Sequence, residues 1–372
     1  MMTRSLRVNS IRRFAITALL LVMVISSAQA AAMKIRPKAY RLIVDVQETM
    51  NPEVKVSENE TKQETPEVDL VAVQGLLDRL NQLNLNKYEQ ALTHQFSASL
   101  ALMKEDYPKA YDFYLKTWLL KSLSPDQQIR LQQTLGQLAL NTEQWKEGTD
   151  HLSTWMIEVK AFNQTVEKPE QQLPIKAQDY VMLANGYVQQ ALWGKTVSNI
   201  QQGIQMFEQA ESKVAPEDWY RISLTAYLHQ EDNTSAIKVL KRLADHYPDM
   251  LYWEQLASLY QQTDNYKLAL TSLHSSYIDG LMTKERHLTW LAQLLIHQES
   301  YHQAALLLEQ SIQAKQVEPS VKNLKILTNA WLMARQYPDA KRALIQLIAL
   351  SPDDKDSKEK LEDVERVLLT KI

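Results

Sequence analysis

Apolar residues recur at intervals of three and four positions from Asp69 to the C-terminus. Leu256, Ala257 and Tyr260 show this spacing, which places apolar side chains on one face of an α-helix. Leu, Ala, Gln, Glu and Lys dominate the region and favour helices, whereas the whole chain contains only seven glycines. The pattern therefore predicts an all-α fold.

Prolines mark the expected boundaries of these helices. Ser124 and Ser351 each stand directly before a proline, as expected of an N-cap residue followed by a proline in the first helical turn. Such signals recur at short intervals, which predicts short helices joined by short turns over residues 69–352. We expect residues 353–372 to form a final capping helix, since their apolar residues share one helical face.

The helical pattern also repeats along the chain. Ala236, Ala269, Ala304 and Ala340 follow one another at intervals of 33, 35 and 36 residues. Before each of the last three alanines, large apolar residues and one small residue occur in the same order and at the same spacing. These positions hold Trp253, Leu256, Ala257 and Tyr260, then Leu288, Leu291, Ala292 and Leu295, then Leu324, Leu327, Thr328 and Trp331. A period of this length is typical of helix–turn–helix repeats that stack side by side.

These residues resemble the tetratricopeptide repeat (TPR) family, whose unit is a helix–turn–helix of about 34 residues. The small residues let the two helices approach closely, the large ones fill the groove beside them, and a proline ends the second helix. Weaker units, with Thr196 in place of the second-helix alanine, extend the resemblance to residues 87–352, with an inserted loop at 162–174. The resemblance implies a right-handed superhelical solenoid of about seven helix pairs.

Residues 1–30 have the layout of a secretory signal peptide. Four arginines without an acid precede a run from Phe14 to Ile25 that is apolar except for Thr17, and an A-x-A pattern ends at Ala30. This run spans about 18 Å of helix, short of the roughly 30 Å of a membrane core, which favours cleavage after Ala30 over a retained anchor. We expect an exported, periplasmic protein with no stable membrane insertion after cleavage.

Residues 31–68 lie between the signal peptide and the repeats. Residues 51–68 contain five Glu, two Pro and no aromatic residue, and such a composition buries too little apolar surface to order a chain. We therefore expect a flexible, disordered linker there. Residues 39–46, before the linker, fit either a strand or an interaction segment.

Charge and composition exclude several classes of function. Removing the four signal-peptide arginines lowers the basic residues from 41 to 37 against 44 acidic ones, a net charge of −7 that argues against nucleic acid as a partner. The absence of cysteine removes thiol chemistry and Cys-based metal sites. The sequence also lacks glycine-rich nucleotide loops, metal-binding histidine motifs and a nucleophile elbow. We expect no cofactor, no metal and no catalytic residue.

The TPR resemblance implies that a partner binds along the exposed side of the first helix of each repeat. The residues that the repeat phase places there are Asn185, Gln189, Arg221, Thr225, Glu254, Ser258, Gln262, Arg286, Gln293, Lys325 and Asn329. Polar side chains in such a row can hydrogen-bond the backbone of an extended peptide, although solvation alone also makes an exposed face polar. Arg221, Glu254 and Arg286 are expected to form a ladder of alternating charge, which either pairs internally or orients a peptide.

Lys325 and Asn329 resemble part of the carboxylate clamp of some chaperone-binding TPR proteins, but companion residues in the following repeats are missing. The layout of the whole chain resembles exported TPR proteins that accompany TonB energy-transduction systems, which implies TonB-system components as partners. These features predict a periplasmic scaffold or adaptor that binds a protein partner and is not an enzyme.

Two alternatives remain open. One is an adaptor in cell-wall or outer-membrane assembly. The other, from a different class, is a glycan-processing enzyme with a helical-toroid fold. Such an enzyme needs a pair of carboxylates in a deep cleft, and Glu254 is the only carboxylate that the repeat phase places centrally on the predicted binding face.

Overall fold

The computed structural model describes residues 35–52 and 68–370, and every regular element within them is helical. The predicted signal peptide and most of the predicted linker lie outside the described residues. The chain forms two compact units, which we call unit 1 (Met1–Ser212) and unit 2 (Lys213–Ile372). Among the described residues, no helix is long and apolar enough to cross a membrane.

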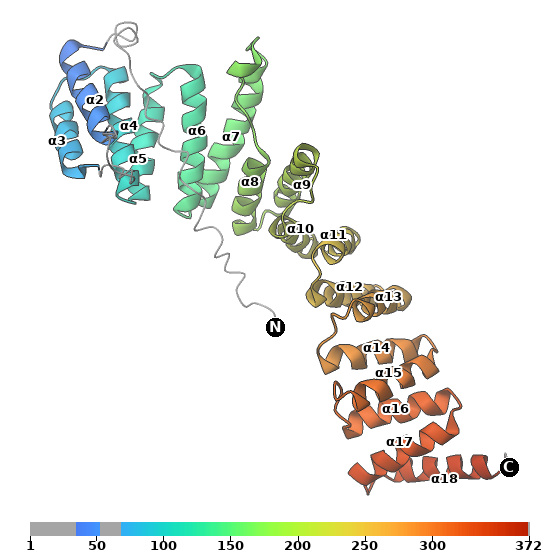
Figure 1. Cartoon of the computed structure of the whole chain (residues 1–372). Helices are drawn as coiled ribbons and strands as arrows, with labels where there is room; N and C mark the ends of the chain where they lie inside the picture. Colours follow the sequence, from blue (N-terminus) through green and yellow to red (C-terminus); the bar gives the residue numbers. More distant parts are fainter. Residues whose placement is uncertain (1–34, 53–67, 371–372) are drawn as a thin grey trace, which may run out of the picture. The chain divides into compact units, whose positions relative to one another are not determined.

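The described part of unit 1 contains α-helices that follow one another in chain order (Figure 1). Their bounds are α2 (Pro37–Met50), α3 (Leu70–Asn81), α4 (Lys87–Met103), α5 (Tyr107–Leu120), α6 (Pro125–Asn141), α7 (Trp145–Asn163), α8 (Ala177–Gln189) and α9 (Trp193–Glu211). A short 3₁₀ helix, η3 (Pro169–Gln171), lies in the connection between α7 and α8, where the sequence predicts an inserted loop. The Asn163 side chain fixes this loop through two 2.8 Å hydrogen bonds with the backbone of Leu173.

Unit 2 continues the same arrangement (Figure 1). Its helices are α10 (Glu217–His229), α11 (Asn233–His246), α12 (Met250–Gln262), α13 (Tyr266–Ile278), α14 (Glu285–His297), α15 (Tyr301–Gln313), α16 (Val321–Met333), α17 (Tyr337–Leu350) and α18 (Lys355–Leu369). Each helix packs against the next along the chain. Within each unit the fold is therefore an array of stacked helical hairpins, which confirms the predicted all-α solenoid architecture.

Every hairpin from α4/α5 to α16/α17 turns at one residue with a left-handed backbone, with φ between 53° and 62°. The residue after it donates its N–H to a carbonyl five positions back, as Asn265 does to Tyr260 and Ser300 does to Leu295, both at 2.8 Å. This arrangement satisfies the carbonyls at the end of the first helix and reverses the chain within a few residues. The seven left-handed residues are Glu105, Glu143, Ala191, Glu231, Asp264, Glu299 and Arg335.

The small residues of the repeat are fully buried between helices. Ala257, Ala269, Ala292 and Ala304 have no exposed surface, and Thr196 is equally buried where it replaces the alanine. Large side chains fill the space beside them and make up most of the core. The pattern that indicated the repeat is therefore also the pattern of burial.

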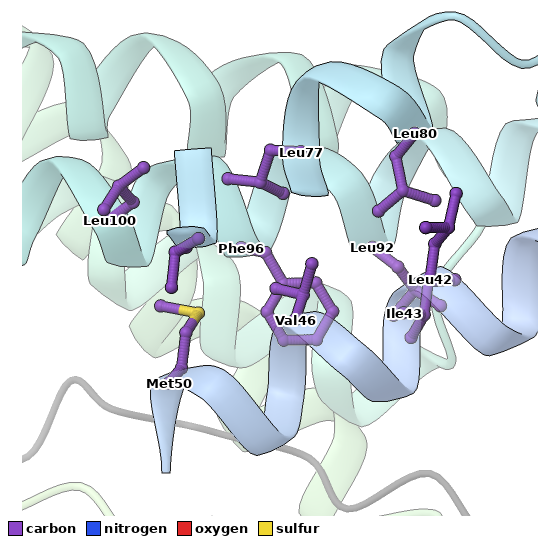
Figure 2. Close-up of a cluster of buried hydrophobic side chains, with 10 residues drawn as sticks. Leu42, Ile43, Val46, Met50, Leu77, Leu80, Leu92, Phe96 and Leu100 are labelled. Atoms are coloured by element: carbon purple, nitrogen blue, oxygen red, sulfur yellow. The ribbon is translucent and has the colours of Figure 1, made fainter. Parts of the chain in front are cut away.

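Residues 39–46 are helical, so the strand considered for them is wrong. They lie within α2, whose apolar residues occur at intervals of three and four and pack on α3 and α4 (Figure 2). Ile43 and Val46 are fully buried there, against side chains that include Leu77 and Phe96. The spacing of these apolar residues is that of a helix, so they all lie on the face that is buried against α3 and α4.

The N-terminus of α2 is also held by a buried carboxylate. Glu89 on α4 is fully buried, and it accepts hydrogen bonds from the backbone and the guanidinium of Arg36, the N-cap residue of α2. Glu89 also completes a capping box with Asn86 at the start of α4. One carboxylate thus joins the starts of two helices that lie far apart in the sequence.

Candidate functional site

The predicted binding residues lie on the first helix of each hairpin. Asn185 and Gln189 belong to α8 in unit 1, and the other nine belong to α10, α12, α14 and α16 in unit 2. We call the polar side of these four helices of unit 2 the A-helix surface. Its members are Arg221, Thr225, Glu254, Ser258, Gln262, Arg286, Gln293, Lys325 and Asn329.

The centre of the A-helix surface is an ion pair between neighbouring hairpins. Arg286 on α14 donates to Glu254 on α12 with 2.7 Å between Nη2 and Oε2. The Glu254 side chain is 26% exposed and that of Arg286 is 59% exposed. The pair is therefore partly open to solvent and joins α12 to α14.

A buried histidine lies beneath this ion pair. Nε2 of His287 is 3.4 Å from the Glu254 carboxylate and accepts a hydrogen bond from Nε of Arg286 at 3.2 Å. Burial, with the positive charge of Arg286, lowers the pKa of His287, although Glu254 acts in the opposite direction. The side chain is therefore neutral at pH 7, as its role as acceptor from Arg286 requires.

Only part of the predicted charge ladder is present. Arg221 pairs with Asp218 on its own helix at 3.5 Å, while Glu254 pairs with Arg286. The side chain that links α10 to α12 is Tyr252, whose hydroxyl donates to Glu217. The repeat phase placed the three charges on one face but did not fix which of them meet, because that depends on how neighbouring helices are offset along their axes.

Lys325 is paired within the chain. Its Nζ lies 2.7 Å from the carboxylate of Asp354, the N-cap residue of α18. A carboxylate does therefore meet Lys325, as in the clamp that the sequence suggested, but it belongs to the capping helix. Asn329, one turn along α16, is exposed.

The remaining predicted residues divide into two groups. Gln189, Gln262 and Gln293 are exposed, like Asn329. Asn185, Ser258 and Thr225 are half-buried, and the Thr225 hydroxyl donates to the backbone carbonyl of Arg221 at 2.9 Å. The exposed amides are thus the members of the predicted set that best suit contact with another molecule.

Two further polar links between first helices of unit 2 were not predicted from the sequence. Trp290 on α14 donates its indole N–H to Gln261 on α12 at 2.8 Å. Asn323 on α16 donates to Glu285 on α14 at 2.7 Å. The repeat gives no signal for these links, since the positions of Gln261 and Trp290 are occupied one repeat later by Ile296 and Ile326.

Within the described residues, no group of three or more His, Asp or Glu side chains is arranged to hold a metal ion.

Burial, and to a lesser degree the charge and hydrogen bond of Glu217, raise the pKa of Tyr252 far above its usual range, so this phenol stays protonated. Its hydrogen bond to Glu217 is a structural link between α10 and α12.

No protein-family model and no curated protein matches the chain. Among solved structures, the C-terminal part of a TPR repeat-containing protein from Cytophaga hutchinsonii is 14% identical over 71% of this chain and 98% of that one, with a TM-score of 0.38. The TPR2AB domain of yeast Sti1 in a complex with pHSP90 is 12% identical over 75% and 97% of the two chains, with a TM-score of 0.39. YrrB, a TPR protein with an unusual peptide-binding site, is 13% identical over 55% and 99%, with a TM-score of 0.35.

At these identities and TM-scores, the likeness adds no weight of its own to the assignment of the fold. The assignment rests on the seven hairpins, their common left-handed turn and their buried small residues. Solved structures to which the chain is similar thus include TPR proteins, and its own architecture is an all-α array of stacked helical hairpins.

Proposed function

We propose that this chain is an exported scaffold whose A-helix surface binds an extended segment of a partner protein. The observation that carries the proposal is a staggered row of exposed amides, Gln262, Gln293 and Asn329, on three successive first helices of unit 2, with Gln262 one helical turn further along its helix than the other two. An amide both donates and accepts hydrogen bonds, so the row suits a peptide backbone, which does the same.

The proposed location is the periplasm. The layout of residues 1–30, with its arginines, apolar run and A-x-A ending, supports export and cleavage after Ala30. More narrowly, we propose a component of a TonB-type transport system as the partner. The support for this step is the resemblance in layout to exported TPR proteins that accompany such systems.

We also propose that the chain has no catalytic activity. Glu254, the carboxylate considered for catalysis, is engaged by Arg286 and is partly open to solvent. A glycosidase requires two carboxyl groups on opposite sides of the scissile bond, one of them with a raised pKa. The polar links on the A-helix surface suit a scaffold, since they connect successive hairpins.

The test uses residues 31–372 as bait with extracts of a Gram-negative envelope, followed by measurement of the affinity for the protein recovered. Replacing Gln262, Gln293 and Asn329 together by Ala should weaken binding at least tenfold, because each lost hydrogen bond contributes about 0.5–1.5 kcal/mol. The matched control replaces three exposed glutamines of second helices, Gln303, Gln310 and Gln346, by Ala and should bind normally.

Each result has a defined meaning. Recovery of a TonB-system component supports the narrower proposal, whereas recovery of a cell-wall or outer-membrane assembly protein replaces it. Equal affinity of both triple variants, with helical circular dichroism unchanged, would remove the A-helix surface as the binding site. Recovery of no specific protein would count against a scaffold.

A further inference from the structure

A pocket of about 430 Å³ lies where α11, α12 and α13 meet in unit 2, apart from the residues of the A-helix surface. Its lining includes Trp253 of α12, Asp245 near the end of α11 and Asp279 just beyond α13. Pro248 and Ile278 also line it, and both are exposed, as are the two aspartates. The volume falls within the range of about 300–1,000 Å³ that is common for ligand sites.

The electrostatics of this pocket favour a cation. Two carboxylates line it, and none of the described residues that line it is Lys or Arg. The C-terminal ends of α11 and α13 also lie there, and each helix C-terminus carries a partial negative charge. The indole ring of Trp253 adds an aromatic face, which attracts cations through its quadrupole.

The next hairpin shows that the repeat itself does not require this chemistry. Counted from the repeated alanines, the positions of Asp245, Trp253 and Asp279 are occupied one repeat later by Ile278, Leu288 and Ala314. Leu288 is only 2% exposed, whereas Trp253 is partly exposed. An aromatic ring flanked by two acids is therefore absent from the equivalent positions of the next junction.

We propose that this pocket, which we call the Trp253 pocket, binds a basic side chain of a partner protein, arginine or lysine. Such a side chain has a long aliphatic stem and a charged end. The stem would pack on Trp253, Pro248 and Ile278, and the charge would lie between Asp245 and Asp279. The charge complementarity and the apolar wall together select this occupant over a metal ion, which needs several converging ligands. The Trp253 pocket is a second contact, independent of the A-helix surface.

The test is an NMR titration of ¹⁵N-labelled residues 31–372, which follows the indole N–H signal of Trp253, assigned with the Trp253→Phe variant. The probes are N-acetyl-arginine amide, N-acetyl-lysine amide and, as the uncharged counterpart of arginine, N-acetyl-citrulline amide. We expect saturable shifts with the two basic probes and none with citrulline. Affinity should be on the order of millimolar and should fall as added salt screens the exposed carboxylates.

Asp245→Asn together with Asp279→Asn should weaken binding of the arginine probe about tenfold or more. The charge-matched control is Asp264→Asn with Glu299→Gln, two exposed acids in hairpin turns, and it should bind as the parent chain does. Equal shifts with citrulline, unchanged binding by the pocket variant, or no shift with either basic probe would overturn the proposal. Tight binding of spermidine without a response to arginine amide would also overturn it, in favour of a free polyamine.

Discussion

Lys325 on α16 holds Asp354, the N-cap residue of α18, with 2.7 Å between Nζ and Oδ2. Asp354 also accepts a hydrogen bond from the backbone N–H of Ser357 at 3.3 Å. One carboxylate therefore both caps the last helix and attaches it to an earlier hairpin. The Lys325 side chain is 49% exposed, and that of Asp354 only 12%.

Asp354→Ala should loosen α18 more than Lys325→Met does. The first change removes the N-cap and the ion pair together, whereas the second leaves the cap in place. Hydrogen exchange of the α18 amides measures the difference, with Asp353→Ala, an exposed neighbour, as the control that should change little. Faster exchange in the Lys325 variant than in the Asp354 variant would contradict this order.

Ile43→Ala should weaken the packing of α2 on α3 and α4. Ile43 has no exposed surface in the cluster of Figure 2, and truncating a buried isoleucine costs about 2–5 kcal/mol. Exchange protection of the α2 amides should fall by orders of magnitude, while the helices of unit 2 keep theirs. Arg41→Ala, at an exposed position of the same helix, is the control. Equal loss of protection in both variants would mean that the apolar cluster does not hold α2.

Acid should release the start of α2 through Glu89. Burial raises the pKa of this carboxyl, but hydrogen bonds from Arg36 and Asn86 outweigh it and leave the pKa lowered overall. Its contribution is therefore fully present above the unfolded pKa of about 4.3 and is lost as the pH falls through the lower folded value. Protection factors of the α2 amides should decrease below about pH 4. Glu89→Gln should show a weaker pH dependence, and an identical one would exclude this carboxyl as its origin.

Mild acid should destabilise both units through histidines that are half-buried (His94 and His151) or buried (His287). Burial is the main cause that lowers the pKa of His94, His151 and His287. The unfolded chain, with a histidine pKa of about 6.5, then binds protons first as the pH falls, so stability is full above that value and declines below it. Urea unfolding at about pH 7.5 and about pH 5.5 measures the loss.

The histidine of unit 2 can be tested separately. His287→Gln should reduce the pH dependence of unit 2, and His274→Gln, at an exposed position, should leave it unchanged. Exchange of the α14 and α16 amides reports on unit 2 alone. An unaltered dependence in the His287 variant would show that other groups produce it.

Replacing Glu299 by Gly should stabilise the α14/α15 hairpin. Glu299 has φ of 58°, a left-handed conformation that costs a residue other than Gly about 1–2 kcal/mol. The larger entropy loss of Gly offsets about 0.5–1 kcal/mol of this, so a net gain between about 0 and about 1.5 kcal/mol is expected. Gln310→Gly, at an exposed position within α15, should instead lower stability by about 1 kcal/mol in urea unfolding. Destabilisation by both changes would argue against strain at Glu299.

Local sequence patterns were sufficient to predict the helices and the repeat. Apolar residues at intervals of three and four set the buried face, and small residues such as Ala269 and Ala304 occupy fully buried positions on it. These are local properties, since spacing along a helix fixes direction around its axis. The same spacing predicts the helix α2, because its apolar residues follow the helical intervals: Ala39, Leu42, Ile43 and Val46. The eight residues 39–46 alone are too few to separate a helix from a strand, which is why the strand remained an alternative.

Which polar side chains are engaged depends on the packing between helices. Repeat phase placed Arg221, Glu254 and Arg286 on one face, yet Arg221 pairs with Asp218 and Arg286 with Glu254. Which charges meet depends on the offset between neighbouring helices and on the rotamers of long side chains, and neither is encoded in the spacing along one helix. The Trp253 pocket could not be predicted from the sequence for the same reason, since residues of three helices form its wall. The sequence thus determined which way each side chain faces, and packing between helices determined what each one meets.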